Sequence, residues 1–264
     1  HRPFHLVNLS FPRTATTSLA GIFQRHGATH EFMRVETINA LLNYRDGKQT
    51  AAAVRQLLLE RARLSGKPVD SAAFLFLSPE IVIETFPKAK FVFVVRDCES
   101  WIVSLLDMEM RVFDSIRRGQ NSIDFSYHPR YARVLSPHFS EQMLLDEASL
   151  KRAIPVLIPE LAHFWRSQSI VVFESMKAVA PANRLIIRLV DFSNAFSNFA
   201  HLAGVPENSL VRQNVHLNRD AFPEQIQKLI GPSFLSNICS KEQRTLDNYL
   251  NRNPGLLNVP LPGK

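Results

Sequence analysis

An α/β fold is predicted for this chain, with a parallel sheet of four to five strands flanked by helices. Short apolar runs, typical of strands that are covered on both faces, alternate along the chain with amphipathic segments of helical period. The 264 residues are 45% hydrophobic and 21% charged, which suits a single globular domain. In such a doubly wound sheet, ligands bind at the carboxyl ends of the strands.

The elements follow from these runs in chain order. Strands are expected at residues 4–9, 28–33, 72–77, 90–95 and 184–190. Helices are expected after residue 18, at 48–65, 79–86, 97–118 and 192–203 with Gly204 as its C-cap, and in short pieces around 223–230 and 241–251.

The middle of the chain has a different character. Residues 119–140 show no period and are expected to form a long loop. Residues 141–180 are expected to be helical, with a break near Pro155 and Pro159. We expect both segments to form an insert or lid within one domain that spans residues 1–264.

Composition narrows the class of protein. Cys98 and Cys239 are the only cysteines, so the sequence predicts no disulfide framework, no Cys/His metal site and a reducing, cytoplasmic setting. No apolar run approaches the roughly 20 residues of a membrane span, and the start lacks the pattern of a signal peptide. The net charge of +7 suggests an anionic partner. Because the basic residues are scattered singly, a small polyanion is favoured over nucleic acid.

The first polar constellation lies between the first strand and the first helix. It consists of Arg13, Thr14, Ala15, Thr16, Thr17 and Ser18. Backbone amides, hydroxyls, a cation and a helix start are what a phosphate or sulfate requires. The Gly-Lys-Ser/Thr ending of a Walker A loop is absent. A Thr-rich helix cap is the alternative, but the run is longer than a cap needs, and we favour an anion-binding loop.

The second constellation surrounds the strand at residues 90–95. Arg96 follows the strand, Asp97 is suited to cap the next helix, and Ser104 lies about two helical turns further on. Arg96 and Ser104 are therefore suited to bind one anion together. The alternative is a surface ion pair for Arg96 and no special role for Ser104.

Together, these two segments resemble the family of sulfotransferases that use 3′-phosphoadenosine-5′-phosphosulfate (PAPS), a family with a P-loop type of fold. Arg13 to Thr17 match the family's loop for the 5′-phosphosulfate, and Arg96 with Ser104 match its site for the 3′-phosphate. Further similarity comes from residues 86–90, 184–192 and 199–206, and the likeness is closer to the carbohydrate and bacterial branch. Ala15 replaces the usual Gly, which would strain the loop if that position needs a positive φ, and Cys98 replaces the usual Pro.

The resemblance implies sulfuryl transfer from PAPS, with 3′-phosphoadenosine-5′-phosphate (PAP) as the product and no metal. Arg13 would then stabilise charge on the leaving phosphate. The catalytic base would be Glu31, as in the carbohydrate branch, and His30, which the cytosolic branch would suggest, is the rival. A simple ion pair of Glu31 with Arg34 is the structural alternative.

The acceptor and the end of the chain are less defined. Arg219 lies in a segment that resembles the family's closing loop and is expected to add charge near a phosphate, although a surface turn explains the segment equally well. The acceptor is expected to be a hydroxyl or amine of a carbohydrate, lipid or small molecule. Two rival functions remain open: a nucleotide-dependent phosphotransferase and a non-catalytic module that binds an anion or nucleotide.

Overall fold

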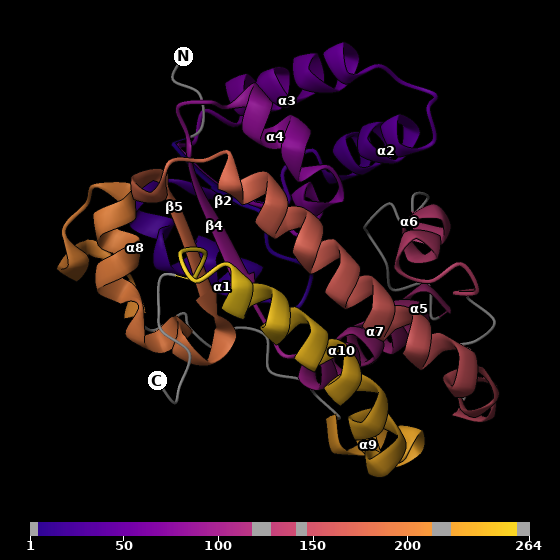
Figure 1. Cartoon of the computed structure of the whole chain (residues 1–264). Coiled ribbons are helices and arrows are strands. Elements are labelled where there is room, and N and C mark those ends of the chain that lie inside the picture. The colour runs from indigo at the N-terminus through magenta and orange to yellow at the C-terminus, as the bar shows by residue number, and fades with distance from the viewer. Residues whose placement is uncertain (1–4, 118–127, 141–146, 213–222, 258–264) are drawn as a thin grey trace. The chain divides into compact units, whose positions relative to one another are not determined.

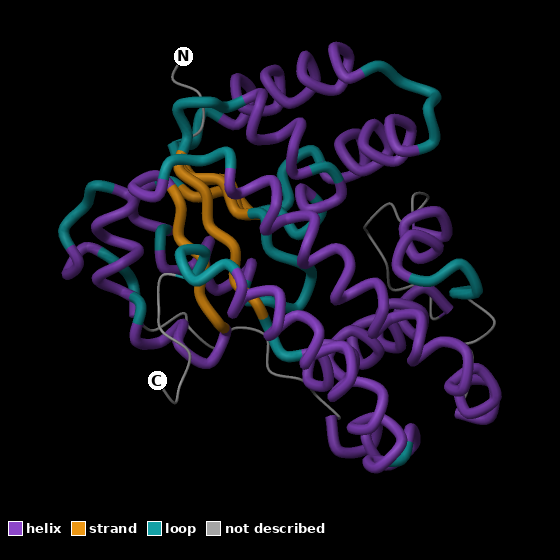
Figure 2. Tube along the Cα trace, viewed as in Figure 1, coloured by secondary structure: helices purple, strands orange, loops and turns teal. Residues whose placement is uncertain are grey.

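The computed structural model describes residues 5–117, 128–140, 147–212 and 223–257. Five parallel strands form one sheet in the order β2-β3-β1-β4-β5 (Figures 1 and 2). Their bounds are Leu6–Asn8 (β1), Ala28–His30 (β2), Val69–Ser71 (β3), Lys90–Val95 (β4) and Arg184–Arg188 (β5). The expected parallel sheet of four to five strands is confirmed.

Two compact units divide the chain. The first comprises residues 1–96, 170–218 and 250–264, and the second comprises residues 97–169 and 219–249. The first unit holds the whole sheet together with α1 (Thr16–Ile22), α2 (Arg34–Arg45), α3 (Ala51–Ser65), α4 (Pro79–Thr85) and α8 (Phe196–Ala203). The second is helical, with α5 (Cys98–Arg117), α6 (His128–Leu135), α9 (Pro223–Ile230) and most of α7 (Glu147–Lys177) and α10 (Pro232–Arg252).

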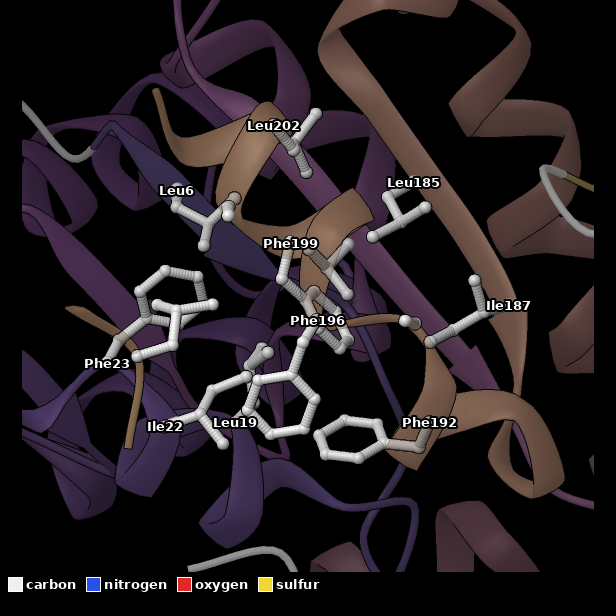
Figure 3. Packing of buried hydrophobic residues seen from close by; sticks show 14 of the residues in the cluster. Leu6, Leu19, Ile22, Phe23, Leu185, Ile187, Phe192, Phe196, Phe199 and Leu202 are labelled. Atoms are coloured by element: carbon white, nitrogen blue, oxygen red, sulfur yellow. The ribbon is translucent and has the colours of Figure 1, made fainter. Parts of the chain in front are cut away.

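Alternate side chains of the strands build the core of the first unit. One face of the sheet packs on α1 and α8. Figure 3 shows Leu19 and Ile22 of α1 in the same cluster as Phe196 and Phe199 of α8. The strand residues in this cluster are Leu6, Val69, Val92, Val94, Leu185 and Ile187. Their spacing of two is the period of a strand with one face on this core.

The opposite face of the sheet is also covered. Phe93 of β4 meets Phe173 of α7 edge-on, with ring centroids 5.2 Å apart. The ring centroids of Phe11 and Phe76 lie 4.9 Å apart. Burial on both faces explains why residues 91–95 of β4 are all apolar rather than alternating with polar residues.

The second unit has its own aromatic core. Trp101 of α5 is fully buried and stacks on Phe164 of α7, with 6.2 Å between the ring centroids. The backbone amide of Cys98 donates to the side chain of Gln243 on α10 at 3.2 Å. Within the described ranges, none of the helices is both long enough and apolar enough to cross a membrane.

The expected strand at residues 72–77 is wrong. The third strand lies earlier, at Val69–Ser71, and the apolar run that follows it forms a turn and a short 3-10 helix at Leu75–Leu77. The run is apolar because it is buried inside the first unit, and burial alone does not distinguish a strand from a buried turn.

The long loop expected over residues 119–140 is wrong where the chain is described. Residues 128–135 form α6, whose buried face consists of His128, Tyr131, Ala132 and Leu135. Those residues follow helical spacing. Because His128 and Tyr131 carry polar atoms on their rings, the sequence does not show this face as an apolar stripe. The buried His128 ring lies 2.7 Å from the carboxylate of Glu109 on α5.

The break expected near residues 155–159 is also wrong, because α7 continues through both prolines. Pro155 is exposed, and the carbonyl that it leaves without a donor belongs to Lys151, which is exposed as well. Water can therefore bond to that carbonyl, so the missing hydrogen bond costs less than in a buried helix. In the C-terminal region α10 is one helix, longer than the expected segment at 241–251.

Candidate functional site

The carboxyl ends of β1, β2 and β4 share one edge of the sheet, because all the strands are parallel. From β1 the chain passes outward to β2, returns to β3, and then crosses to β4 on the other side of β1. Such a change of direction is the point at which α/β sheets bind ligands. The segments that leave this edge are the loop after β1, the turn after β2 and Arg96 after β4.

The loop after β1 has an unusual backbone. Arg13 and Ala15 both adopt the left-handed conformation, with φ of 65° and 64°. The amide and the hydroxyl of Thr14 both donate to the carbonyl of Phe11, at 3.3 and 2.5 Å. Left-handed residues alternating with others turn successive amides toward one side, which makes a concavity suited to an anion.

Ala15 has the positive φ that strains the backbone of an L-residue. Ala15 stands at the N-cap of α1 with φ 64° and ψ 23°, where an L-residue pays about 1–2 kcal/mol and glycine pays none. The loop thus keeps a glycine-like conformation without the glycine. Behind it, Thr16 and Ser18 are buried, while Thr17 and Arg13 are partly exposed.

Arg96 reaches the loop from β4. Its Nη1 donates to the carbonyl of Arg13 at 3.0 Å, across 83 positions of sequence. The two segments that the sequence singled out within the first unit therefore meet.

A buried polar network supports the loop from below. The side-chain amide of Asn8 donates to the hydroxyl of Ser71 at 3.0 Å, and that hydroxyl in turn donates to the backbone carbonyl of Thr16 at 2.7 Å. Ser10 donates to Asn8 Oδ1 and accepts from the amide of Val94, at 2.5 and 2.8 Å. The network joins β1, β3, β4 and the start of α1. Sequence reasoning missed it, although polar residues that end an apolar strand were its signal.

His30, at the end of β2, faces the loop. Its Nε2 lies 3.4 Å from Thr17 Oγ1. The ring is exposed to solvent, but desolvation by the surrounding chain lowers its pKa from the ordinary value, against the raising effect of the Glu31 and Asp70 carboxylates. A lowered pKa keeps the imidazole neutral, and therefore able to accept a proton, near pH 7.

Glu31 begins the turn after β2. Its Oε2 lies 3.0 Å from Nη1 of Arg34, and both side chains are largely buried. The i+3 ion pair that was the structural alternative for Glu31 is therefore present. Glu31 and Met33 are both left-handed, with φ of 54° and 47°.

A buried ion pair underlies this turn, and sequence reasoning missed it. Arg61 of α3 donates through both terminal nitrogens to the two carboxylate oxygens of Asp70 on β3, and the Nη2–Oδ1 distance is 2.7 Å. Both side chains are at most 1% exposed. The signal was available, because Arg61 falls within the apolar stripe of α3, beside Val54, Leu58 and Ala62.

Two predicted site residues are not among the described residues of the first unit. Ser104 belongs to α5 in the second unit and is fully buried, and Arg219 lies outside the described residues. Asp97 caps α5 as expected, since its carboxylate accepts from the amide of Ser100 at 2.9 Å. In the part of the chain that the structure describes, no group of three or more His, Cys, Asp or Glu residues is placed to hold a metal ion.

Of three comparisons with known proteins, one shows the family. A solved sulfotransferase from Alicyclobacillus acidocaldarius is 12% identical, with a TM-score of 0.43 over 92% of this chain and 99% of that chain. No curated protein matches the sequence. A family model described as a sulfotransferase domain matches residues 5–150, which is more than half of the 264 residues. The chain therefore belongs to the sulfotransferase domain family.

Proposed function

We propose that this chain transfers a sulfuryl group from PAPS to a hydroxyl or amine of a carbohydrate, lipid or small-molecule acceptor, and releases PAP. The observation that carries the proposal is the hydrogen bond from Arg96, after β4, to the Arg13 carbonyl in the loop after β1. In a member of the sulfotransferase family, this contact joins the segment proposed for the 5′-phosphosulfate to the arginine proposed for the 3′-phosphate.

The residues fit the two anionic ends of PAPS. Loop amides between Arg13 and Ser18, with the hydroxyls of Thr16 and Thr17, would bind the 5′-phosphosulfate. Arg96 would bind the 3′-phosphate as a planar donor that pairs well with phosphate oxygens. We propose that Ser104 and Arg219 add contacts to the nucleotide.

In the proposed reaction, the acceptor oxygen or nitrogen attacks sulfur in line with the leaving group. The bond between sulfur and the bridging oxygen breaks, and PAP leaves with the electron pair. Arg13 would offset the charge that grows on that oxygen, as cations do in phosphoryl transfer. The acceptor proton passes to a base of the chain.

Two groups compete for the role of base. His30 is supported by its lowered pKa and by its position 3.4 Å from Thr17. Glu31 already accepts a hydrogen bond from Arg34, so an acceptor would have to compete with that ion pair for its carboxylate. We therefore propose His30 as the base, with Glu31 as the competing choice.

Ligand-induced thermal stabilisation tests the proposal. PAP should raise the melting temperature, because a ligand at 100 times its dissociation constant adds about 2.7 kcal/mol. ATP with Mg²⁺ should not match this effect, and adenosine 5′-phosphate, which lacks the 3′-phosphate, should be weaker than PAP. The reverse order, with ATP and Mg²⁺ ahead of PAP, would establish the phosphotransferase alternative instead.

One contact weighs against the phosphotransferase. Asp70 is the carboxylate on the strand beside β1, and Arg61 holds both of its oxygens inside the fold. Binding a Mg²⁺ ion there would require breaking a buried ion pair. For the non-catalytic alternative, the test is whether the chain binds PAP yet leaves PAPS intact with 4-nitrophenol and N-acetylglucosamine as acceptor probes.

We also propose a cytoplasmic compartment and a single-domain organisation for this chain. Cys98 and Cys239 are free and buried, which is consistent with a reducing, cytoplasmic compartment. The family match at 5–150 runs through residues of both units. This supports our proposal that residues 1–264 form one sulfotransferase domain. We also propose a small anionic nucleotide, rather than nucleic acid, as its partner.

A further inference from the structure

We propose that Arg61 is a positioning residue that fixes the turn at residues 31–33 and thereby holds His30 at the loop proposed to bind the sulfuryl donor, residues 13–18 (the donor loop). The inference rests on the proposed function, since it assigns Arg61 a role in the geometry of the proposed base. Arg61 itself lies inside the fold and would touch neither donor nor acceptor.

The guanidinium of Arg61 is fixed on three sides. Its two terminal nitrogens donate to the carboxylate of Asp70, and its Nε donates to the carbonyl of Phe32 at 2.8 Å. Its plane also lies against the ring of Phe74, with 5.4 Å between Cζ and the ring centroid. A fully buried group held in this way has little freedom to move, so it presents a rigid donor to the turn.

The turn needs such a donor because its own backbone is strained. Glu31 and Met33 are left-handed on either side of Phe32, a conformation that L-residues keep only where their surroundings impose it. The carbonyl that Arg61 holds belongs to the residue between the two strained positions. At the far end, the Met33 carbonyl accepts from the amide and the hydroxyl of Thr37, at 3.0 and 2.6 Å.

The carboxylate of Asp70, the partner of Arg61, also acts electrostatically on His30. Asp70 lies beside β2, since Thr29 is its partner in the ladder, and its carboxylate raises the pKa of His30. The other charged groups that act on His30 are Glu31, which raises its pKa, and Arg34, which lowers it. Desolvation, the largest effect on this ring, depends on how closely the turn packs, and therefore on the hold of Arg61 on Phe32.

Arginine, rather than any cation, is required by this geometry. The fork must serve two carboxylate oxygens and one carbonyl at the same time, and its planar set of donors does so in one conformation. A lysine would keep the charge beside Asp70 but could not hold all three oxygens. Arg61→Lys therefore separates positioning from charge.

The experiment compares Arg61→Lys with Arg63→Lys, a matched change on the same helix at an exposed arginine that pairs with Glu60. In Arg61→Lys, hydrogen exchange in a peptide covering residues 28–38 should be about tenfold faster through local opening. The titration midpoint of the His30 ring, followed by NMR and assigned with His30→Gln, should rise toward the ordinary value because a looser turn desolvates the ring less. The dissociation constant for PAP should change by less than about twofold, because Arg61 is fully buried and is not among the groups proposed to contact the nucleotide. Arg63→Lys should change none of these.

A folded Arg61→Lys protein with the turn exchange and the His30 midpoint of the parent would overturn the inference. If Arg61→Lys does not fold, Arg61→Met with Asp70→Leu removes both charges and keeps the volume, a replacement that buried pairs tolerate. Faster exchange confined to residues 28–38 in that variant supports the inference, and unchanged exchange overturns it. Failure of the parent protein to bind PAP would refute the proposed function and leave the turn measurements to judge Arg61 separately.

Discussion

The turns after β1 and β2 share a backbone plan but differ in what supports them. Each has two left-handed residues separated by one other, at positions 13 and 15 and at positions 31 and 33. Each also has a carbonyl held by an arginine from elsewhere in the first unit. Arg96 donates to the carbonyl of Arg13 at 3.0 Å, and Arg61 donates to that of Phe32 at 2.8 Å.

The two arginines differ in burial. Arg61 is fully buried and committed to Asp70, whereas Arg96 is partly exposed at the end of β4. A buried guanidinium can only hold the fold, while one at the edge can hold the loop and still reach a ligand in water. The same contact with a turn is therefore compatible with both roles that we propose, positioning for Arg61 and binding for Arg96.

Loss of the buried arginine should have the largest effect. Arg61→Met leaves the Asp70 carboxylate buried without its partner, and should lower the free energy of unfolding by about 3–5 kcal/mol. Urea denaturation measures this, with Arg63→Met on the same helix as the control, expected within about 0.5 kcal/mol of the parent. A loss below about 1 kcal/mol for Arg61→Met would show that water reaches Asp70 and would break the contrast between the arginines.

Loss of the edge arginine should act on binding instead. Arg96→Ala removes a charged hydrogen bond to the proposed 3′-phosphate, worth about 1.5–3 kcal/mol, and should weaken PAP binding about 10- to 150-fold. Binding of adenosine 5′-phosphate, which lacks that phosphate, should weaken less, because it is affected only through the lost hydrogen bond to the Arg13 carbonyl. Titration calorimetry with both nucleotides measures the difference, and an unaltered preference for PAP in Arg96→Ala would refute this role.

Relief of strain should give a smaller effect in both turns. Ala15→Gly and Met33→Gly each remove a left-handed L-residue, and each should stabilise the protein by up to about 1 kcal/mol after the entropy of glycine is subtracted. Thermal unfolding measures both, and Ala20→Gly within α1 is the control, which should destabilise by about 1 kcal/mol. Destabilisation by Ala15→Gly would mean that its methyl group packs better than its backbone conformation suggests.

The smallest effect concerns pH. The pKa of His30 is lowered in the folded chain, first by desolvation, so the unfolded chain binds a proton more readily. Stability should therefore fall as the pH drops below the ordinary value of 6.5 toward the folded pKa. His30→Gln should remove this part of the slope in urea midpoints between about pH 7.5 and 5. His201→Gln, at an exposed position of α8, is the control, and an equal slope in His30→Gln would show that other groups cause it.

The sequence predicted what local patterns encode. The strand at 90–95, the polar loop after β1 and the helix that Asp97 caps each depend on a few neighbouring residues, and the structure has all three. The resemblance to sulfotransferases rested on the same segments, and the family match confirms it.

What the sequence did not predict depends on residues far apart in the chain. The third strand contains Asp70, a residue that strands rarely bury, and only Arg61 of α3 makes that burial possible. The apolar run beyond it was the stronger local signal and was mistaken for the strand. The helix α6 was missed for a related reason, because His128 becomes an inward-facing residue only beside Glu109 of α5.

The buried polar network beneath the loop after β1 limits which substitutions this chain can accept. Asn8, Ser10 and Ser71 occupy fully buried positions, at which valine would be the usual choice for a stable strand. Such a change would favour the strand conformation but would remove the present partners of the buried Thr16 carbonyl and Val94 amide, at a cost of about 1–3 kcal/mol for each group. The hydroxyls that look unfavourable in the interior are thus the groups that support the loop after β1.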